Sequence, residues 1–137
     1  MIAESVAKYL EENSIGIRGT NIFIGEIPLG KTNCISLVYT PSPDPNKAID
    51  VYEQVIDFRS RFKRTDIGYD KMIDIFNLLH KGQNYKIDDY HVYFSNALGM
   101  IEDNDRDSER RKLFKLSIKF IYRKDWLATR CMKTAFN

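Results

Sequence analysis

The sequence predicts an α+β fold, with a mainly antiparallel sheet and two helices packed on one face of it. Two long segments alternate apolar and polar residues, which is typical of half-buried antiparallel strands. Two other segments carry apolar residues at helical spacing. Because inner strands of a Rossmann-type sheet are apolar on both faces, these amphipathic strands disfavour that fold. The expected order is α-β-β-β-α-β-β-β, with one domain over residues 1–123 and a C-terminal arm over 124–137.

The first third of the chain contains the first helix and two strands. An amphipathic pattern over Ile2–Asn13 predicts a helix of about three turns, and Gly16 and Gly19 follow as turn residues. Asn21–Gly25 has the composition of a short strand. The β-branched and apolar residues of Cys34–Thr40 predict a buried strand.

A long strand and the second helix follow a proline-rich loop. Pro41–Asp50 contains three of the four prolines, which exclude regular structure. Tyr52–Lys63 alternates two sets of side chains, so it predicts a half-buried strand. The N-cap candidates Thr65–Asp66 open a helical pattern, and Lys81 and Gly82 provide its stop signal. One face of the strand contains Ile56, Phe58, Ser60 and Phe62, and the other contains Asp57, Arg59, Arg61 and Lys63.

Three more strands complete the predicted sheet. Tyr85–Asp88 and His91–Ala97 form a hairpin with a tight turn at Asp88–Asp89. The polar segment Glu102–Arg111 predicts a solvated loop, and Lys112–Lys124 alternates as the clearest strand of the chain. The predicted core contains Phe58, Phe62, Met72, Phe76, Leu79, Phe114, Leu116, Ile118 and Phe120.

Composition excludes several classes of protein. The 137 residues suit one domain, and 43% hydrophobic and 29% charged residues are typical of a globular chain. With 21 basic and 19 acidic residues, the overall field will not steer polyanions strongly. Neither a signal peptide nor a membrane span is visible, so we expect a soluble protein made in a cytoplasm, with no membrane partner.

The sequence provides little for catalysis or metal binding. Cys34 and Cys131 form no CxxC pair, and we interpret them as reduced thiols and expect no cofactor. His80 and His91 stand beside no recognisable nucleophile motif. The alternating Asp103, Asp105 and Asp107 resemble the start of a calcium loop but lack its glycine, so a solvated loop is preferred.

The sequence is compatible with two kinds of binding surface. Arg59, Arg61 and Lys63 follow one strand face, and Lys115 and Lys119 extend the row, as a phosphate-binding face would. A half-buried sheet has a polar face in any case, and no aromatic residues interleave to stack bases. Alternatively, the polar face, the two loops and the arm are protein interfaces. The arm carries Trp126, Leu127, Met132 and Phe136, which either pack on their own domain or anchor to a neighbouring subunit.

Taken together, these segments resemble the small minor capsid family of long-tailed bacteriophages, the tail terminator or tail completion proteins. The resemblance runs from Ile2 to about Arg123 and rests on the order and character of the predicted elements, not on a catalytic motif. It is carried by NIFIG with Pro28 just after it, by the CISLVY strand before the proline loop, and by the helix end IFNLLH.

The resemblance implies a non-enzymatic structural protein. Such proteins form a ring, typically of six copies, on the head-proximal end of the tail tube, where they stop polymerisation and present a surface to head-completion or connector proteins. Double-stranded DNA passes through the lumen without sequence-specific binding. The alternatives are a head-completion (head–tail joining) protein or a small nucleic-acid-binding protein.

The resemblance also implies where partners are met, in the virion and, during assembly, in the host cytoplasm. We expect Arg59, Arg61, Lys63, Lys115 and Lys119 to meet acidic groups of a neighbouring copy or to line the lumen. We expect double charge reversal at Arg59 and Arg61 to abolish the ring while the monomer stays folded. The tube or connector contacts are expected at Pro43, Asp44, Pro45, Asn46, Asp103, Asp105, Arg106 and Asp107.

Overall fold

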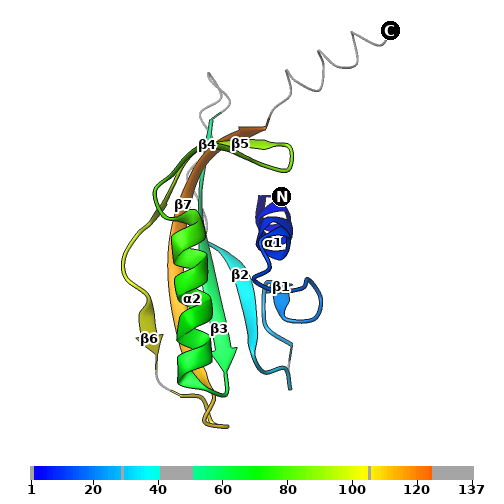
Figure 1. Cartoon of the computed structure of the whole chain (residues 1–137), viewed down its shortest axis with the longest axis vertical. Helices are drawn as coiled ribbons and strands as arrows, with labels where there is room; N and C mark the ends of the chain where they lie inside the picture. Colours follow the sequence, from blue (N-terminus) through cyan, green and yellow to red (C-terminus); the bar gives the residue numbers. More distant parts are fainter. Residues whose placement is uncertain (1, 29, 41–50, 105, 125–137) are drawn as a thin grey trace, which may run out of the picture.

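The computed structural model describes residues 2–28, 30–40, 51–104 and 106–124 of the protein. It shows two helices and a seven-stranded sheet (Figure 1). The elements are α1 (Ile2–Glu12), β1 (Ile22–Ile24), β2 (Cys34–Thr40), β3 (Tyr52–Phe62), α2 (Thr65–Leu79), β4 (Gly82–Ile87), β5 (Tyr90–Ala97), β6 (Glu102–Asn104) and β7 (Lys112–Lys124). The predicted α+β class is therefore confirmed.

The sheet is built around the ladder between β3 and β7. Its main path runs β1-β2-β3-β7-β5-β4, and β6 pairs with β7 beside this path. Among the strands in the described residues, β1 and β2 run parallel and the other pairs are antiparallel. The β3–β7 register extends from Tyr52 opposite Tyr122 to Phe62 opposite Lys112. Because β7 is longer than any of its neighbours, its second edge is shared by β5 and β6.

The register defines a continuous row across one half of the sheet. Phe23 lies opposite Ser36, Ser36 opposite Arg59, Arg59 opposite Lys115, and Lys115 opposite Glu102. This half is thus five strands wide, with β1 at one margin and β6 at the other. The short strands β1 and β6 therefore share one row of the register and lie on opposite sides of the molecule (Figure 1).

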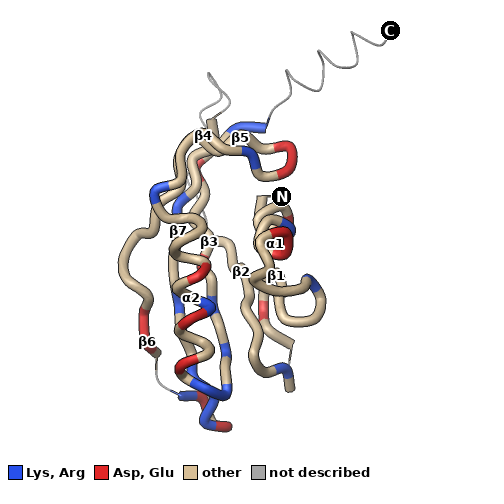
Figure 2. Tube along the Cα trace, in the orientation of Figure 1, with Lys and Arg blue, Asp and Glu red and all other residues tan. Residues whose placement is uncertain are grey.

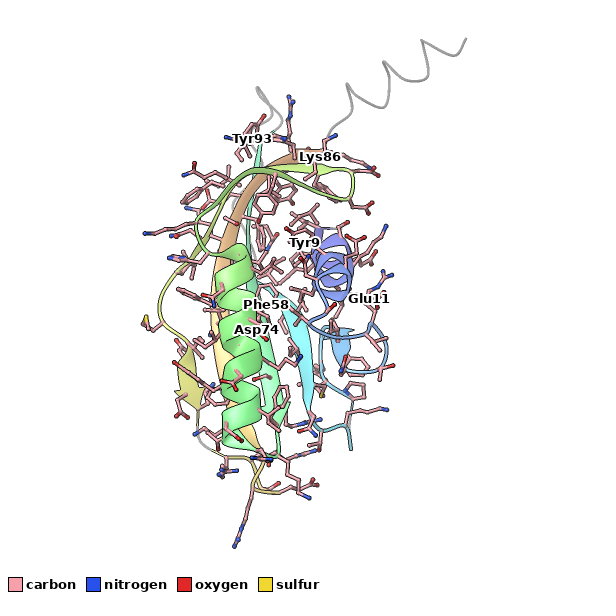
Figure 3. All side chains as sticks on the ribbon, viewed as in Figure 1. Tyr9, Glu11, Phe58, Asp74, Lys86 and Tyr93 are labelled. Atoms are coloured by element: carbon pink, nitrogen blue, oxygen red, sulfur yellow. The ribbon has the colours of Figure 1, made fainter. Side chains whose placement is uncertain are left out.

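Both helices cover the same face of the sheet. The backbone N–H of Ala3 in α1 donates to the hydroxyl of Tyr39 at 2.8 Å, and Gly68 of α2 lies directly above Phe62 and Phe114. These three aromatic residues point to one side, because their positions in the register have the same parity. Tyr9 of α1 faces the sheet, with its ring 6.0 Å from that of Tyr85, whereas Glu11 points away (Figure 3). Within the described residues, no helix covers the opposite face.

The core lies between this face and the two helices. Eight of the nine predicted core side chains are buried: Phe58, Phe62, Met72, Leu79, Phe114, Leu116, Ile118 and Phe120. Phe76 is only partly buried and stacks on His80 with ring centroids 4.5 Å apart. Burial of these side chains provides the main driving force for folding.

The predicted ends of the second helix are wrong in detail. The helix begins at Thr65, its N-cap is Arg64, and no side chain caps it. At the other end His80 is the C-cap, and Lys81, with φ of 58°, adopts the left-handed conformation expected of Gly82. Gly82 instead opens β4, where a Cβ atom would come within 2.7 Å of Ser95 Oγ. Its lack of a side chain therefore permits close packing rather than a helix stop.

The predicted turn at Asp88–Asp89 is confirmed, since Ile87 pairs with Tyr90. The solvated loop over Glu102–Arg111 is wrong for its first three residues, which form β6. All three are exposed, so the strand has no apolar pattern. It forms because β5 leaves the edge of β7 after Ala97, and backbone hydrogen bonding can continue there.

Candidate functional site

The uncovered face of the sheet carries the polar residues of β3 and β7. Figure 2 shows basic residues along these two strands and acidic residues at β6. The predicted alternation is confirmed, with Arg59 opposite Lys115 across the ladder. This face is the candidate functional site, because it brings together most of the predicted interface residues.

Asp57 lies at the centre of this face and organises it. Its side chain is 10% exposed, and its Oδ1 accepts a hydrogen bond from Ser117 Oγ at 2.6 Å. Arg59 Nη2 and Lys115 Nζ lie 3.6 and 3.8 Å from its Oδ2. A buried carboxylate needs such partners, because desolvation of an unpaired charge is costly. The cluster fixes the cationic groups of Arg59 and Lys115 around one anion.

The cations of this face are still partly accessible to solvent. The side chains of Arg59, Lys115 and Lys119 are 53%, 32% and 35% exposed. Lys119 pairs with Glu53, with 2.8 Å between Nζ and Oε1. Lys63 lies just past the end of β3, where its backbone N–H donates to Asn33 Oδ1 at 3.1 Å. The face is thus basic but already partly neutralised from within the subunit.

Arg61 has a role inside the subunit that the sequence did not suggest. Its Nε and Nη2 donate to the carbonyl of Lys31 at 3.0 and 2.8 Å, and Nη2 also donates to the carbonyl of Pro28 at 2.9 Å. Arg111, which immediately precedes β7, donates from Nη1 to the same Lys31 carbonyl at 3.2 Å. Two guanidinium groups therefore hold the segment between β1 and β2 against the ends of β3 and β7.

Arg111 is positioned in turn by Asp107. The carboxylate of Asp107 accepts hydrogen bonds from the backbone N–H groups of Glu109 and Arg111 and from Arg111 Nε. Desolvation raises the pKa of Asp107, but these hydrogen bonds and the charge of Arg111 outweigh it and lower the pKa below its ordinary value. We call the region formed by Arg61, Asp107 and Arg111 the Arg111 end of the molecule.

A groove crosses the uncovered face near this end. It has a volume of about 670 Å³ and runs from Glu26 and Ile27, beside β1, to Glu102 and Asn104 of β6. Its floor includes Ser36, Val38, Arg59, Leu113 and Lys115. The groove is therefore basic and apolar in the middle and acidic at both margins.

Of the predicted contact loops, the structure describes only part. Pro43, Asp44, Pro45, Asn46 and Asp105 lie outside the described residues. Asp103 forms an ion pair with Lys112. Arg106 donates to the Arg110 carbonyl at 2.6 Å and to Thr65 Oγ1 at 2.8 Å, so it links its loop to the start of α2. The four arm residues, Trp126, Leu127, Met132 and Phe136, also lie outside the described residues.

The sequence analysis missed an aromatic cluster at the opposite end. The Tyr122 ring stacks on Tyr52 with centroids 5.7 Å apart and meets the edge of Tyr90 at 5.4 Å. Burial raises the pKa of Tyr122 to about 12. A small cleft of about 220 Å³ opens here between Ile2, Tyr39 and the rings of Tyr90 and Tyr122. The sequence signal that could have indicated this cluster is the presence of tyrosines near the ends of several predicted strands. We call this region the tyrosine end.

The side chains considered for catalysis have structural surroundings. His80 Nδ1 accepts a hydrogen bond from the backbone N–H of Ala97 at 3.1 Å, and His91 meets the ring of Tyr93 edge-on. Burial raises the pKa of the free Cys34 thiol. Among the described residues, no three His, Cys, Asp or Glu side chains are grouped to hold a metal ion. In that same part of the chain, no helix is both long and apolar enough to cross a bilayer.

These features define an α+β protein whose charged side chains form a basic sheet face and two different ends, as in a protein that binds other macromolecules. A family model described as bacteriophage tail terminator protein matches residues 9–124, and this is a family of structural proteins of the phage tail. The chain belongs to the bacteriophage tail terminator family, as its resemblance indicated. No curated protein shows significant sequence similarity to it.

Proposed function

We propose that this protein ends the growth of a phage tail tube. Copies form a ring, of six subunits as the family resemblance implies, on the head-proximal end of the tube. The ring stops tube polymerisation and joins the tail to head-completion or connector proteins, without catalysis or a cofactor, after assembly in the host cytoplasm. The family match over residues 9–124 carries this proposal.

The two ends of the β3–β7 ladder support distinct axial contacts. Residues 106–111 lie at the Arg111 end, whereas Thr40, Val51 and Lys124 lie at the tyrosine end. The ladder separates these ends by roughly 30–35 Å, given the strand rise. A terminator binds the tube at one end and must offer a different surface at the other, or growth would continue. We propose that the loop 41–50 and the residues of 102–111 that follow β6 make these contacts, and that the C-terminal arm 124–137 anchors its apolar residues on a neighbour.

The uncovered sheet face suits the lumen of such a ring. Arg59, Lys115 and Lys119 are partly exposed and already paired with Asp57 or Glu53. A weakly basic wall attracts phosphates without holding them tightly, because affinity for DNA grows with the number of phosphates neutralised. We propose that these side chains face the DNA, which slides past without base recognition.

Tube length provides the test of this function. Purified tube protein polymerises alone or with the terminator at one ring per tube, and electron micrographs record the lengths. We expect shorter tubes with label for the terminator at one end only. Unchanged lengths with binding to the connector would assign the head-completion function instead. A gel shift with short duplexes that weakens steeply with salt, without an effect on tubes, would favour nucleic-acid binding.

A further inference from the structure

The largest exposed apolar side chains of the described sheet margins form two groups on opposite sides of the molecule. Met100 and Leu98, in the connection from β5 to β6, are 79% and 54% exposed. Ile17 and Ile24, before and within β1, are 59% and 44% exposed. We call these the β6 flank and the β1 flank. Large exposed aliphatic groups beside short edge strands are typical of surfaces that bind another protein.

The two flanks are at the same height on the sheet. Ile24 pairs with Leu37 in β1 and β2, and the backbone N–H of Leu98 donates to the carbonyl of Ser117 in β7. Leu37 lies opposite Phe58 and Ser117 lies opposite Asp57, so the two flanks differ by one residue along the ladder. The five-stranded half between them is about 19 Å wide, from four strand spacings.

The β6 flank is acidic, whereas the β1 flank carries two cations that could pair with it. The β6 flank presents the exposed carboxylates of Glu102 and of Asp103, which also pairs with Lys112. The β1 flank presents Arg18 and Lys31, together with the carboxylates of Glu11 and of Glu26 at the margin of the groove. Arg18 pairs with Glu11 at 3.6 Å but keeps 47% of its side chain exposed. Opposite charges that surround apolar centres favour one pairing of the flanks over others.

We propose that the β6 flank of one copy docks against the β1 flank of the next. The two surfaces differ, so the contact is heterologous, and repeated rotation closes it into a ring. The partner is a second copy of this chain. This inference rests on the proposed function for the ring, and it places subunit contacts on the margins rather than on Arg59 and its neighbours. The sheet face and the two ladder ends then stay free for DNA and for axial partners.

Two charge-introducing variants test the docking. Met100→Asp and Ile24→Asp each bring a carboxylate into one flank, and Ile67→Asp is a matched control on α2, where Ile67 is 43% exposed against 44% for Ile24. Analytical ultracentrifugation of the full chain measures self-association, and thermal unfolding verifies the fold. We expect each flank variant to self-associate at least about 30-fold more weakly, because a buried unpaired charge is costly, and the control to match the wild type.

Mixing the two variants tests the heterologous geometry. Ile24→Asp keeps an intact β6 flank, and Met100→Asp keeps an intact β1 flank, so an equimolar mixture should form dimers that cannot grow further. If Ile24→Asp fails to fold, Ile17→Asp in the exposed turn replaces it. A mixture that stays monomeric, or flank variants that assemble like the wild type, would overturn the inference.

The flank contact and the terminator function can each fail without the other. Wild-type protein that caps tubes but never self-associates, even on the tube, would overturn the flank contact and leave tube termination standing. Wild-type protein that forms flank-dependent rings without affecting tube length would support the contact and overturn the terminator function.

Discussion

Ser60 and Ser117 occupy opposite faces of the same ladder and have opposite surroundings. Ser117 Oγ donates to the buried carboxylate of Asp57 at 2.6 Å. Ser60 is 2% exposed beneath the helices, and its Oγ has no hydrogen-bond partner within the described residues. A hydrogen bond to a charged group stabilises the fold, whereas a buried hydroxyl without a partner costs free energy. The same residue type therefore has opposite energetic effects at the two positions.

We expect Ser117→Ala to lower the free energy of unfolding by about 1–2 kcal/mol, since it removes a donor to a charged acceptor at a partly exposed position. Ser60→Ala serves as the matched substitution on the neighbouring strand and should be neutral or stabilising. Urea denaturation of both variants gives the two values. Equal destabilisation by both substitutions would show that Asp57 does not depend on Ser117.

At the scale of elements, α2 packs closely on the sheet at Gly68. A Cβ atom there would lie 2.9 Å from Phe62 Cβ and 3.1 Å from Phe114 Cε2. Both aromatic side chains are buried and cannot move away without disturbing the core. The glycine is needed for this contact, although it is a poor residue for a helix.

We therefore expect Gly68→Ala to destabilise the protein by about 1–3 kcal/mol from overpacking, in spite of the roughly 1 kcal/mol that alanine gains in helix propensity. Asn77→Ala on the exposed side of α2 is the control and should stabilise slightly. Thermal unfolding with circular dichroism compares them. A stabilised Gly68→Ala variant would mean that α2 can shift outward at no cost.

The elements also show which boundaries a sequence can predict. The alternation of Tyr52–Phe62 and Lys112–Lys124 predicted both long strands, because burial on one face imposes a period of two. Neither β6 nor the cap at Arg64 has such a pattern. Strand β6 depends on backbone groups of β7 that β5 leaves unpaired, and those groups are the same for every residue type.

At the scale of the whole molecule, Arg59 and Arg61 of the predicted basic strand face have different roles. Arg59 is 53% exposed at its side chain and faces outward beside Asp57. Arg61 instead holds the backbone of Pro28 and Lys31. Double charge reversal would therefore combine a surface effect with damage to the fold, and the single variants are more informative.

We expect Arg59→Glu to lose about 1–2 kcal/mol of stability, because the buried carboxylate of Asp57 keeps only Lys115 and Ser117 as partners, and to keep the fold and the ring while infectivity falls. Arg61→Glu should lose about 1–3 kcal/mol, because the carbonyls of Pro28 and Lys31 lose their donors. Thermal unfolding, mass measurement and plaque complementation separate the two effects. Loss of the ring in a folded Arg59→Glu variant would place this face against a neighbouring copy instead of the DNA.

The amino-acid sequence alone determined the α+β class, the basic face of the sheet, most of the core and the resemblance to tail terminators. Each follows from local periodicity or composition, which report whether a side chain is buried. Only the tertiary structure decided that Arg61 and Arg111 hold the segment after β1, that Asp57 centres the basic face, and that Ile24 and Met100 mark two margins at one height. These relations join residues far apart in the chain, and strand register, which no local pattern records, brings them together.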